Sequence, residues 1–410
     1  MDHLGTVSLG IWLKCGSAYE DMQNNGMSHM VEHMIFKGTD TRSASELSED
    51  MTYLGSGFDA FTTKEFTCYY FTVLSEHLDK AVSLFSDMIQ HSVFDEEEFR
   101  REKDVVLDEI ALYNDSPDDA VHEMLEKSVW FSHPLGFQIS GEEKKVKSFS
   151  RDQVYEYYRK NYTAENMIIS AAGNFDDKKL LDLLNDTFGS IPEGNESRNI
   201  TTPEYKRCIY YEEKDTDQIY LNLCMPGCTV NASDRFDDSM VQTILGGSES
   251  SRLFRKIRDE KGLTYSVSSY SDPYICAGLT FIDLVIDHNR LKDAVRGIID
   301  ILADLSENGV TENELTRTRE QVKSEIMIAD ESSRFRMENY GKGMLFRNEP
   351  SRAEATIEKI NKTDHESAER AIKKYYDHLN ASVSVIGPVT SHDVDYIKKI
   401  TNINTVLAKK

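Results

Sequence analysis

Two histidines four positions apart, His29 and His33, with Glu32 beside the second, have the types and spacing that best suit chemistry in this chain. At 3.6 residues per turn these three positions share one face of a helix, so their side chains can converge on one point. Imidazole nitrogens at this spacing suit a tetrahedral zinc ion, and a carboxylate beside the open coordination position could accept a proton from water. The order H-x-x-E-H is that of a zinc-protease helix read in reverse. The alternative is a histidine pair on an ordinary solvated or internally satisfied helix face.

A third zinc ligand is expected on a second helix, which an acidic start near residue 95 and an apolar stripe at Val105, Val106 and Ile110 predict. Glu102 and Glu109 lie on one face of that helix, close to the stripe. They are about 10 Å apart along the helix axis, whereas zinc–oxygen bonds are about 2 Å long. Only one of the two glutamates can therefore be a ligand, and the spacing alone does not say which.

At this point the chain resembles the pitrilysin/insulinase peptidases, in particular the short branch related to the mitochondrial processing peptidase. The similarity runs from about Leu9 to the C-terminus, and it includes residues 57–70 (GFDAFTTKEFTCYY) and the SRLF segment from Ser251. The resemblance implies one zinc ion per chain. The roles that it implies are zinc ligands for His29, His33 and Glu109, the general base for Glu32, and support of the ligands from outside the coordination sphere for Glu102.

The resemblance also assigns residues to substrate binding. An extended peptide can be held by adding it as a strand to a sheet edge, and the strand to which the family gives this role contains Ala60, Phe61, Thr62 and Thr63. Asp59 stands where the family usually has Asn, which adds a negative charge. In the second half, Arg258 and Tyr265 match a pair that contacts substrate at the zinc site in relatives, and both are suitable donors to a peptide carbonyl and its oxyanion.

The implied function is a zinc-dependent metalloendopeptidase that hydrolyses short or unfolded peptides. The alternative is a non-catalytic peptide-binding or scaffold subunit of the same fold, but such members typically lose the motif. The longer relatives look like two such chains fused, so we expect a homodimer that encloses a chamber, with Arg258 and Tyr265 of one subunit serving the zinc of the other.

Composition narrows the function classes. A chain of 410 residues is expected to hold more than one domain. The net charge of −24 disfavours nucleic acid as a partner and favours basic peptides, although it also simply promotes solubility. The six cysteines show no disulfide framework, and no apolar run is long enough to span a membrane. We expect a soluble, cytoplasmic protein with no membrane partner. Because family members usually have another strand before this start, we also expect the first strand to be missing or the start to be trimmed.

The chain repeats itself. Residues 30–33 align with 240–243, residues 77–82 with 290–295, and residues 94–110 with 310–326, at offsets of 210, 213 and 216. This predicts an α+β protein of two homologous lobes, each a mostly antiparallel sheet with helices packed on one face. The expected boundaries are a zinc-binding catalytic lobe at 1–192, a polar linker at 193–205, and a homologous lobe without metal at 206–410.

The repeat also provides an internal control for the motif. The second-half counterparts of His29, Glu32 and His33 are Ser239, Gln242 and Thr243, while the apolar residues around them are kept in both copies. A purely structural role would give no reason for the polar set to change together. We therefore expect the zinc site in the first lobe only.

Overall fold

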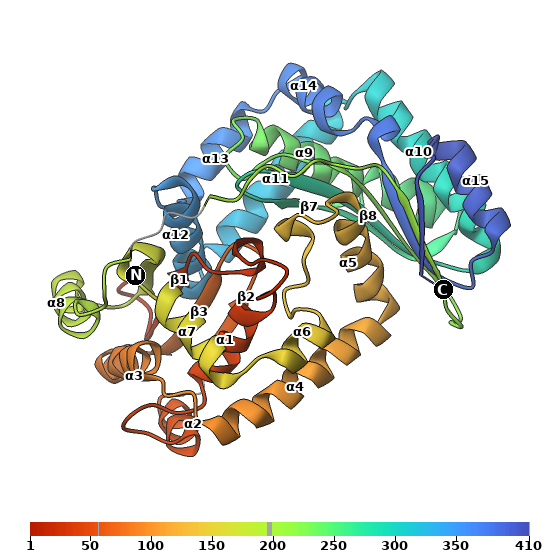
Figure 1. Ribbon diagram of the computed structural model, residues 1–410. Helices are drawn as coiled ribbons and strands as arrows, with labels where there is room; N and C mark the ends of the chain where they lie inside the picture. The colour runs from red at the N-terminus through yellow and green to blue at the C-terminus, as the bar shows by residue number, and fades with distance from the viewer. Residues whose placement is uncertain (56, 195–198, 410) are drawn as a thin grey trace. The chain divides into compact units, whose positions relative to one another are not determined.

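The computed structural model describes residues 1–55, 57–194 and 199–409. They form two β-sheets with associated helices, which confirms the predicted α+β class. The chain divides into two compact units, each built from three segments. Unit 1 contains Met1–Ala111, Phe137–Asn199 and Met327–Ala353, and unit 2 contains Leu112–Gly136, Ile200–Ile326 and Glu354–Lys410. Figure 1 shows the elements with their labels.

The sheet of unit 1 has the order β2-β3-β1-β4, and every neighbouring pair is antiparallel. The bounds are β1 Thr6–Leu13, β2 Phe58–Thr62, β3 Thr67–Leu74 and β4 Met167–Gly173. Alternate residues of β1, namely Val7, Leu9, Ile11 and Leu13, point into one hydrophobic core. β2 is the outer strand on one side of this sheet.

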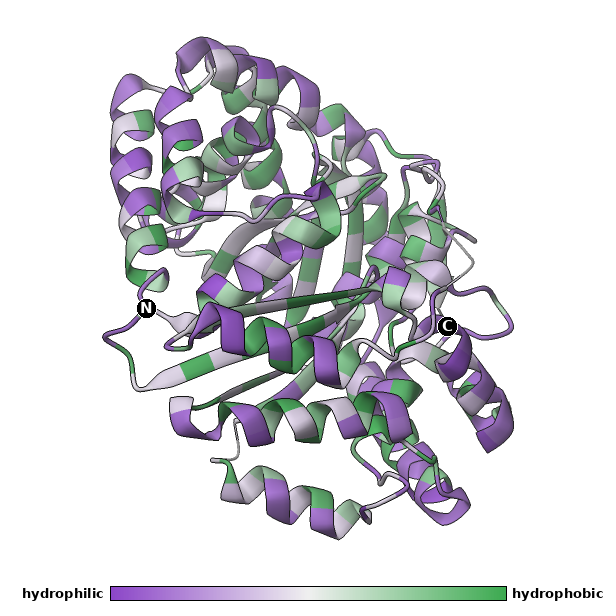
Figure 2. Cartoon of the chain, turned by 90° about the vertical axis from the view of Figure 1, so that its left-hand side faces the viewer, coloured by the Kyte–Doolittle hydropathy of each residue, from purple (hydrophilic) through white to green (hydrophobic). Residues whose placement is uncertain are grey.

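Most helices of unit 1 pack on the face of the sheet that carries this core. They are α1 Met27–Ile35, α2 Ala44–Tyr53, α3 Leu78–His91, α4 Glu96–Asp115, α6 Glu143–Ser148, α7 Arg151–Asn161 and α8 Asp177–Phe188. The last residues of α4, from Leu112, are assigned to unit 2. Figure 2 shows the pattern behind this arrangement, with hydrophobic residues along the strands and alternating hydrophilic and hydrophobic residues along the helices.

The opposite face of this sheet is covered by α12, Ser333–Arg347, which comes from the second half of the sequence (Figure 1). Two glycines allow the close approach. A Cβ on Gly10 would meet the sulfur of Met337, and a Cβ on Gly341 would overlap the ring of Trp12. The Trp12 indole donates to Ser170 Oγ at 2.9 Å, which satisfies its polar atom inside this second core.

The sheet of unit 2 has the order β10-β5-β9-β6-β8-β7. The bounds are β5 Ile209–Glu213, β6 Ile219–Pro226, β7 Thr264–Pro273, β8 Gly278–Ile286, β9 Ser382–Gly387 and β10 Val406–Lys409. Its four strands β7-β8-β6-β9 repeat the order β2-β3-β1-β4 of unit 1, which agrees with the duplication seen in the sequence. The β10–β5 and β5–β9 pairs are parallel, and the others are antiparallel.

The main core of unit 2 lies between this sheet and helices of the second repeat. The helices of the repeat that belong to this unit are α9 Arg235–Gly246, α10 Leu291–Asn308, α11 Glu312–Ala329 up to Ile326, α13 Ala353–Lys362 from Glu354, α14 His365–Tyr375 and α15 Ser391–Thr401. The other face of the sheet is covered by α5, Pro117–Val129, from the first half of the sequence.

The two units therefore exchange one helix each relative to a simple division along the sequence. The lobes proposed at 1–192 and 206–410 stay a prediction about the repeated halves, and residues 195–198 of the proposed linker lie outside the described residues. Within the described part of the chain, we find no helix with both the length and the apolar composition needed to cross a membrane.

Candidate metal centre

The N-terminus of α1, which carries the two histidines, is held by a buried carboxylate. Glu20 is 3% exposed and accepts hydrogen bonds from the backbone N–H groups of Gly26 and Ser28, both at 2.7 Å, and from the side chain of Asn25. A carboxylate at this end suits the unpaired N–H groups and the positive pole of the helix. Burial raises the pKa of Glu20, and these hydrogen bonds oppose that shift. The sequence reasoning missed this residue because its partners are not at regular capping positions.

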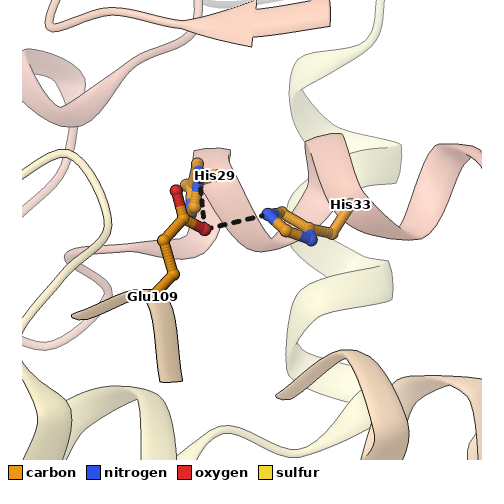
Figure 3. A group of neighbouring side chains, drawn as sticks. All are labelled: His29, His33 and Glu109. Carbon is orange, nitrogen blue, oxygen red and sulfur yellow. Dashed lines mark ion pairs between the residues drawn. The ribbon is translucent and has the colours of Figure 1, made fainter. Parts of the chain in front are cut away.

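His29, His33 and Glu109 meet at one point in unit 1 (Figure 3). One oxygen of Glu109 lies 3.7 Å from Nε2 of His29 and 3.5 Å from Nε2 of His33. Tetrahedral zinc with bonds of about 2.0–2.1 Å places its ligand atoms about 3.4 Å apart. The spacing of these three atoms therefore fits an ion of that size and geometry, and the donor set of two imidazoles and one carboxylate is one that zinc accepts.

Burial and charge set different protonation tendencies on the two histidines. Burial, followed by the charge on His33, lowers the pKa of His29 to about 4, so this imidazole is neutral near pH 7. Burial also opposes the charged form of His33, but hydrogen bonds to Glu102 and Glu109 and the nearby Glu32 outweigh it and raise its pKa to about 9. The surrounding carboxylates therefore favour a positive charge at this point.

Glu102 contacts the same imidazole as Glu109 but at the other nitrogen. Its carboxylate lies 3.1 Å from Nδ1 of His33 and 2.7 Å from Nζ of Lys37. A carboxylate on the outer nitrogen fixes the orientation and the tautomer of a metal-binding imidazole. In this geometry Glu109 faces both histidines, whereas Glu102 lies behind one of them. The sequence reasoning missed Lys37, although its position four residues after His33 was an available signal.

Glu32 lies next to this group and is oriented by the edge strand. The hydroxyl of Thr62 in β2 donates to its carboxylate at 2.5 Å. Burial raises the pKa of Glu32, while the hydrogen bond from Thr62 opposes that shift. A carboxylate with a raised pKa is suited to taking up and releasing a proton near neutral pH.

The four residues predicted to bind a peptide strand lie at the sheet edge. Ala60, Phe61 and Thr62 are in the outer strand β2, and Thr63 follows its last residue. Asp59 on the same strand accepts a hydrogen bond from the Tyr70 hydroxyl at 2.6 Å and from the Ala60 N–H at 2.9 Å. Each of its two oxygens therefore accepts one hydrogen bond, whereas the family's usual Asn has a single oxygen that could accept.

Arg258 and Tyr265 belong to unit 2. Arg258 is exposed, lies in a π-helical segment, Phe254–Glu260, and stacks over the ring of Phe254. Tyr265 is 89% exposed. The pairing of β7 with β8 shifts register between Thr264 and Ser266, so Tyr265 is the extra residue of a bulge. Both segments have irregular backbone of the kind that is over-represented at functional sites, and the sequence reasoning predicted neither irregularity.

Comparisons with known proteins agree with this architecture. Residues 3–143 match the family model described as insulinase, peptidase family M16, and residues 148–322 match the model described as the peptidase M16 inactive domain. The chain is 36% identical over 388 residues to an uncharacterized zinc protease, YmxG, of Bacillus subtilis, covering 94% of this chain and 95% of that protein. It is 35% identical over 343 residues to an uncharacterized zinc protease of Rickettsia bellii, covering 83% of each.

Solved structures show the same two-lobe fold. A peptidase M16 inactive domain from Pseudomonas fluorescens superimposes with a TM-score of 0.89 at 20% identity, over 95% of this chain and 94% of that one. A protease from Helicobacter pylori gives a TM-score of 0.87 at 20% identity, over 94% of each chain. The fold is thus that of a two-lobe metallopeptidase-like protein. The chain belongs to the insulinase family of peptidases, M16.

Proposed function

We propose that this protein is a zinc-dependent endopeptidase acting on short or unfolded peptides, with one zinc ion held by His29, His33 and Glu109. The observation that carries the proposal is the convergence of these three side chains at distances suited to tetrahedral zinc, with Glu32 beside them. The names of the relatives as zinc proteases support it. The inverted motif places both histidines and the base on the single helix α1.

A zinc ion bound here would activate a water molecule and polarise a peptide carbonyl. Glu32 would then accept the proton of that water and later donate it to the leaving amine. The hydroxyl of Thr62 keeps the carboxylate of Glu32 turned toward the reaction point. Glu102 holds His33 through Nδ1, and Lys37 keeps Glu102 charged and in place. Tyr265 would donate to the oxyanion, and Arg258 would bind a substrate carbonyl.

The outer position of β2 supports peptide binding by strand addition. Ala60, Phe61, Thr62 and Thr63 would pair with the substrate main chain, which requires little from its sequence. Asp59 on this strand and the net charge of −24 favour substrates with basic residues.

We further propose that the active site is completed in a homodimer enclosing a chamber, so that Arg258 and Tyr265 of one subunit act at the zinc of the other. Within unit 2, both side chains are exposed, and the bulge projects Tyr265 away from its sheet. Exposed donors of this kind are available to another chain. The six cysteines show no disulfide framework in the sequence, which supports a reducing compartment, and we propose the cytoplasm.

The rival function is a non-catalytic subunit that binds peptides or serves as a scaffold. A subunit without catalysis would need none of the set formed by His29, Glu32, His33 and Glu109, yet all four are present and adjacent. Mass spectrometry of a random peptide pool, incubated with the zinc-loaded protein and with chelator, distinguishes the two functions. We expect new internal cleavages that chelator abolishes and that Glu32→Gln does not produce. An unchanged pool with zinc fully loaded would favour the non-catalytic subunit.

A further inference from the structure

A second group of side chains of metal-binding types lies in unit 2, on elements other than α1 and α4. His122 and Glu126 are four residues apart on α5 and therefore share a helix face, as His29 and His33 do on α1. Asp272 faces them from β7. One ligand atom from each of the three residues lies within 4.8 Å of the others. Three residues from two elements thus point their ligand atoms at one location.

The imidazole of His122 is held through its outer nitrogen. Nδ1 lies 2.6 Å from the hydroxyl of Tyr270, and Nε2 faces the carboxylate of Asp272 at 3.8 Å, which is too long for a hydrogen bond. When Nδ1 donates to the hydroxyl oxygen of Tyr270, Nε2 carries the lone pair, on the side of the ring that faces Asp272.

A buried amide supports the same tautomer. Asn222 is fully buried, its Nδ2 lies 3.3 Å from Nδ1 of His122, and its Oδ1 has no hydrogen-bond partner. The oxygen and nitrogen of an amide have nearly the same shape, so the assignment between them follows the hydrogen bonds. Exchanging them lets Oδ1 accept the Nδ1 proton. Nε2 is then again the nitrogen without a proton.

The carboxylate of Glu126 completes the group. Glu126 is 3% exposed, and the hydroxyl of Tyr274 donates to its Oε1 at 3.0 Å. A hydrogen bond to one oxygen orients a carboxylate for metal binding by the other. Two carboxylates and one imidazole at this separation offer three ligand atoms to one cation.

We propose that His122, Glu126 and Asp272 form a second metal site, for a divalent ion such as Mn²⁺ or Zn²⁺, that fastens α5 to β7. One imidazole with two carboxylates suits these ions better than Ca²⁺ or Mg²⁺, which prefer oxygen ligands alone, and no thiolate takes part. The second repeat lacks the H-x-x-E-H motif and has Ser239, Gln242 and Thr243 at the matching positions. The proposed site does not use these positions, because its ligands lie on α5 and β7. Of the three ligands only Asp272 lies in the second lobe, at 206–410, so the proposal revises the expectation that this lobe binds no metal.

The proposed role is structural. α5 reaches unit 2 from the first half of the sequence, and His122 and Asp272 are far apart along the chain. A metal that closes a long loop stabilises a fold by restricting the unfolded chain, and its binding energy adds to folding energy. Metal binding at this site should therefore raise the melting temperature independently of peptidase activity.

The test uses a full-length chain in which His29→Ala and His33→Ala remove the first site. After stripping with chelator, Mn²⁺ is titrated and free Mn²⁺ is followed by electron paramagnetic resonance, with Zn²⁺ as competitor. We expect about one bound equivalent, displaced by Zn²⁺, and a rise in melting temperature. Adding Asp272→Asn or His122→Gln should weaken binding by at least about tenfold, as loss of a ligand costs no less than loss of an outer contact.

Asp119→Asn is the matched control, since it removes an exposed carboxylate from the same helix without touching the three ligands. It should leave Mn²⁺ binding unchanged. Circular dichroism of the metal-free proteins shows whether each variant folds. If a variant does not fold, anomalous diffraction from wild-type crystals soaked in Mn²⁺ decides, and a peak between the three side chains is expected. Absence of binding at millimolar Mn²⁺ and Zn²⁺, equal binding by folded Asp272→Asn, or crystals without a peak between His122, Glu126 and Asp272 overturns the proposal. None of these outcomes bears on the first site.

Discussion

Glu102 and Glu109 have similar positions in the sequence pattern but different positions at the imidazole of His33. Glu109 meets Nε2 on the side shared with His29, and Glu102 meets Nδ1 together with Lys37. The seven-residue spacing predicted only that both lie on one face of α4. Their roles depend on which nitrogen each carboxylate reaches, and no pattern within one helix contains that information. The resemblance to a family did distinguish them in advance.

The first prediction at this scale concerns these two glutamates. Glu102→Gln should lower zinc affinity by about 10–100-fold, since it weakens the support of His33. Glu109→Gln should lower it further, because it replaces a charged ligand. Competition with a chromogenic chelator measures both affinities. Glu98→Gln, on the same helix and away from His33, is the control and should bind zinc as the wild type does. A larger loss in Glu102→Gln than in Glu109→Gln would exchange their roles.

The second prediction concerns Glu32, the proposed general base. Glu32→Gln nearly preserves the shape of the side chain but cannot accept a proton, so turnover should fall by about 10²–10⁴-fold. Zinc content should stay at the wild-type level, because Glu32 is not among the three converging ligands. Metal analysis and peptide cleavage on the same preparation measure the two effects separately. Cleavage close to the wild-type rate would show that the proton acceptor is another group.

At the scale of elements, regular structure was predictable and irregular structure was not. The acidic start followed by an apolar stripe predicted α4, because this pattern is local. The bulge at Tyr265 has no such pattern, since the sequence around it alternates like an ordinary strand. The sequence also did not predict that the buried Glu20 caps α1. Its hydrogen-bond partners, Gly26 and Ser28, reach it only through the conformation of the loop before the helix.

The bulge gives the third prediction. The Thr264 hydroxyl is hydrogen-bonded to the backbone of Ser266 and of Val285, and so stabilises the conformation that exposes Tyr265. Thr264→Val should lower the free energy of unfolding by about 1–2 kcal/mol, the cost of losing a buried hydrogen bond. It should also lower kcat/KM, as Tyr265→Phe is expected to do, because the phenol of Tyr265 is then less well positioned.

Urea unfolding and peptide cleavage measure the two effects. Ser271→Ala is the control, since it removes a hydroxyl from the same strand that bonds Thr280 and not the bulge. The control variant can lose a similar amount of unfolding free energy, but its kcat/KM should stay near that of the wild type. Unchanged cleavage in folded Thr264→Val would separate the bulge from catalysis.

At the scale of the whole molecule, the duplication was predictable and the exchange of helices was not. Repeated apolar positions indicated two copies of one unit, and the matching strand orders of the two sheets agree with this. The amphipathic patterns of α5 and α12 predict that each helix packs against a sheet. They do not say which of the two sheets it covers. Small residues such as Gly10 and Gly341 permit the close packing of α12, and their meaning becomes clear only beside Trp12 and Met337.

The last prediction tests whether two chains complete one active site. Glu32→Gln and Tyr265→Phe should each be inactive alone, the first without a base and the second without the phenol donor. In a mixed dimer, the zinc site of the Tyr265→Phe chain keeps its Glu32 and receives Tyr265 from the other subunit. Random exchange at equal concentrations makes about half of the dimers mixed with one intact site each, so about a quarter of wild-type activity should return. Native mass spectrometry with one isotope-labelled variant confirms the exchange, and each variant mixed with itself is the control. If exchange is complete and no activity returns, Tyr265 acts within its own chain or takes no part in the reaction.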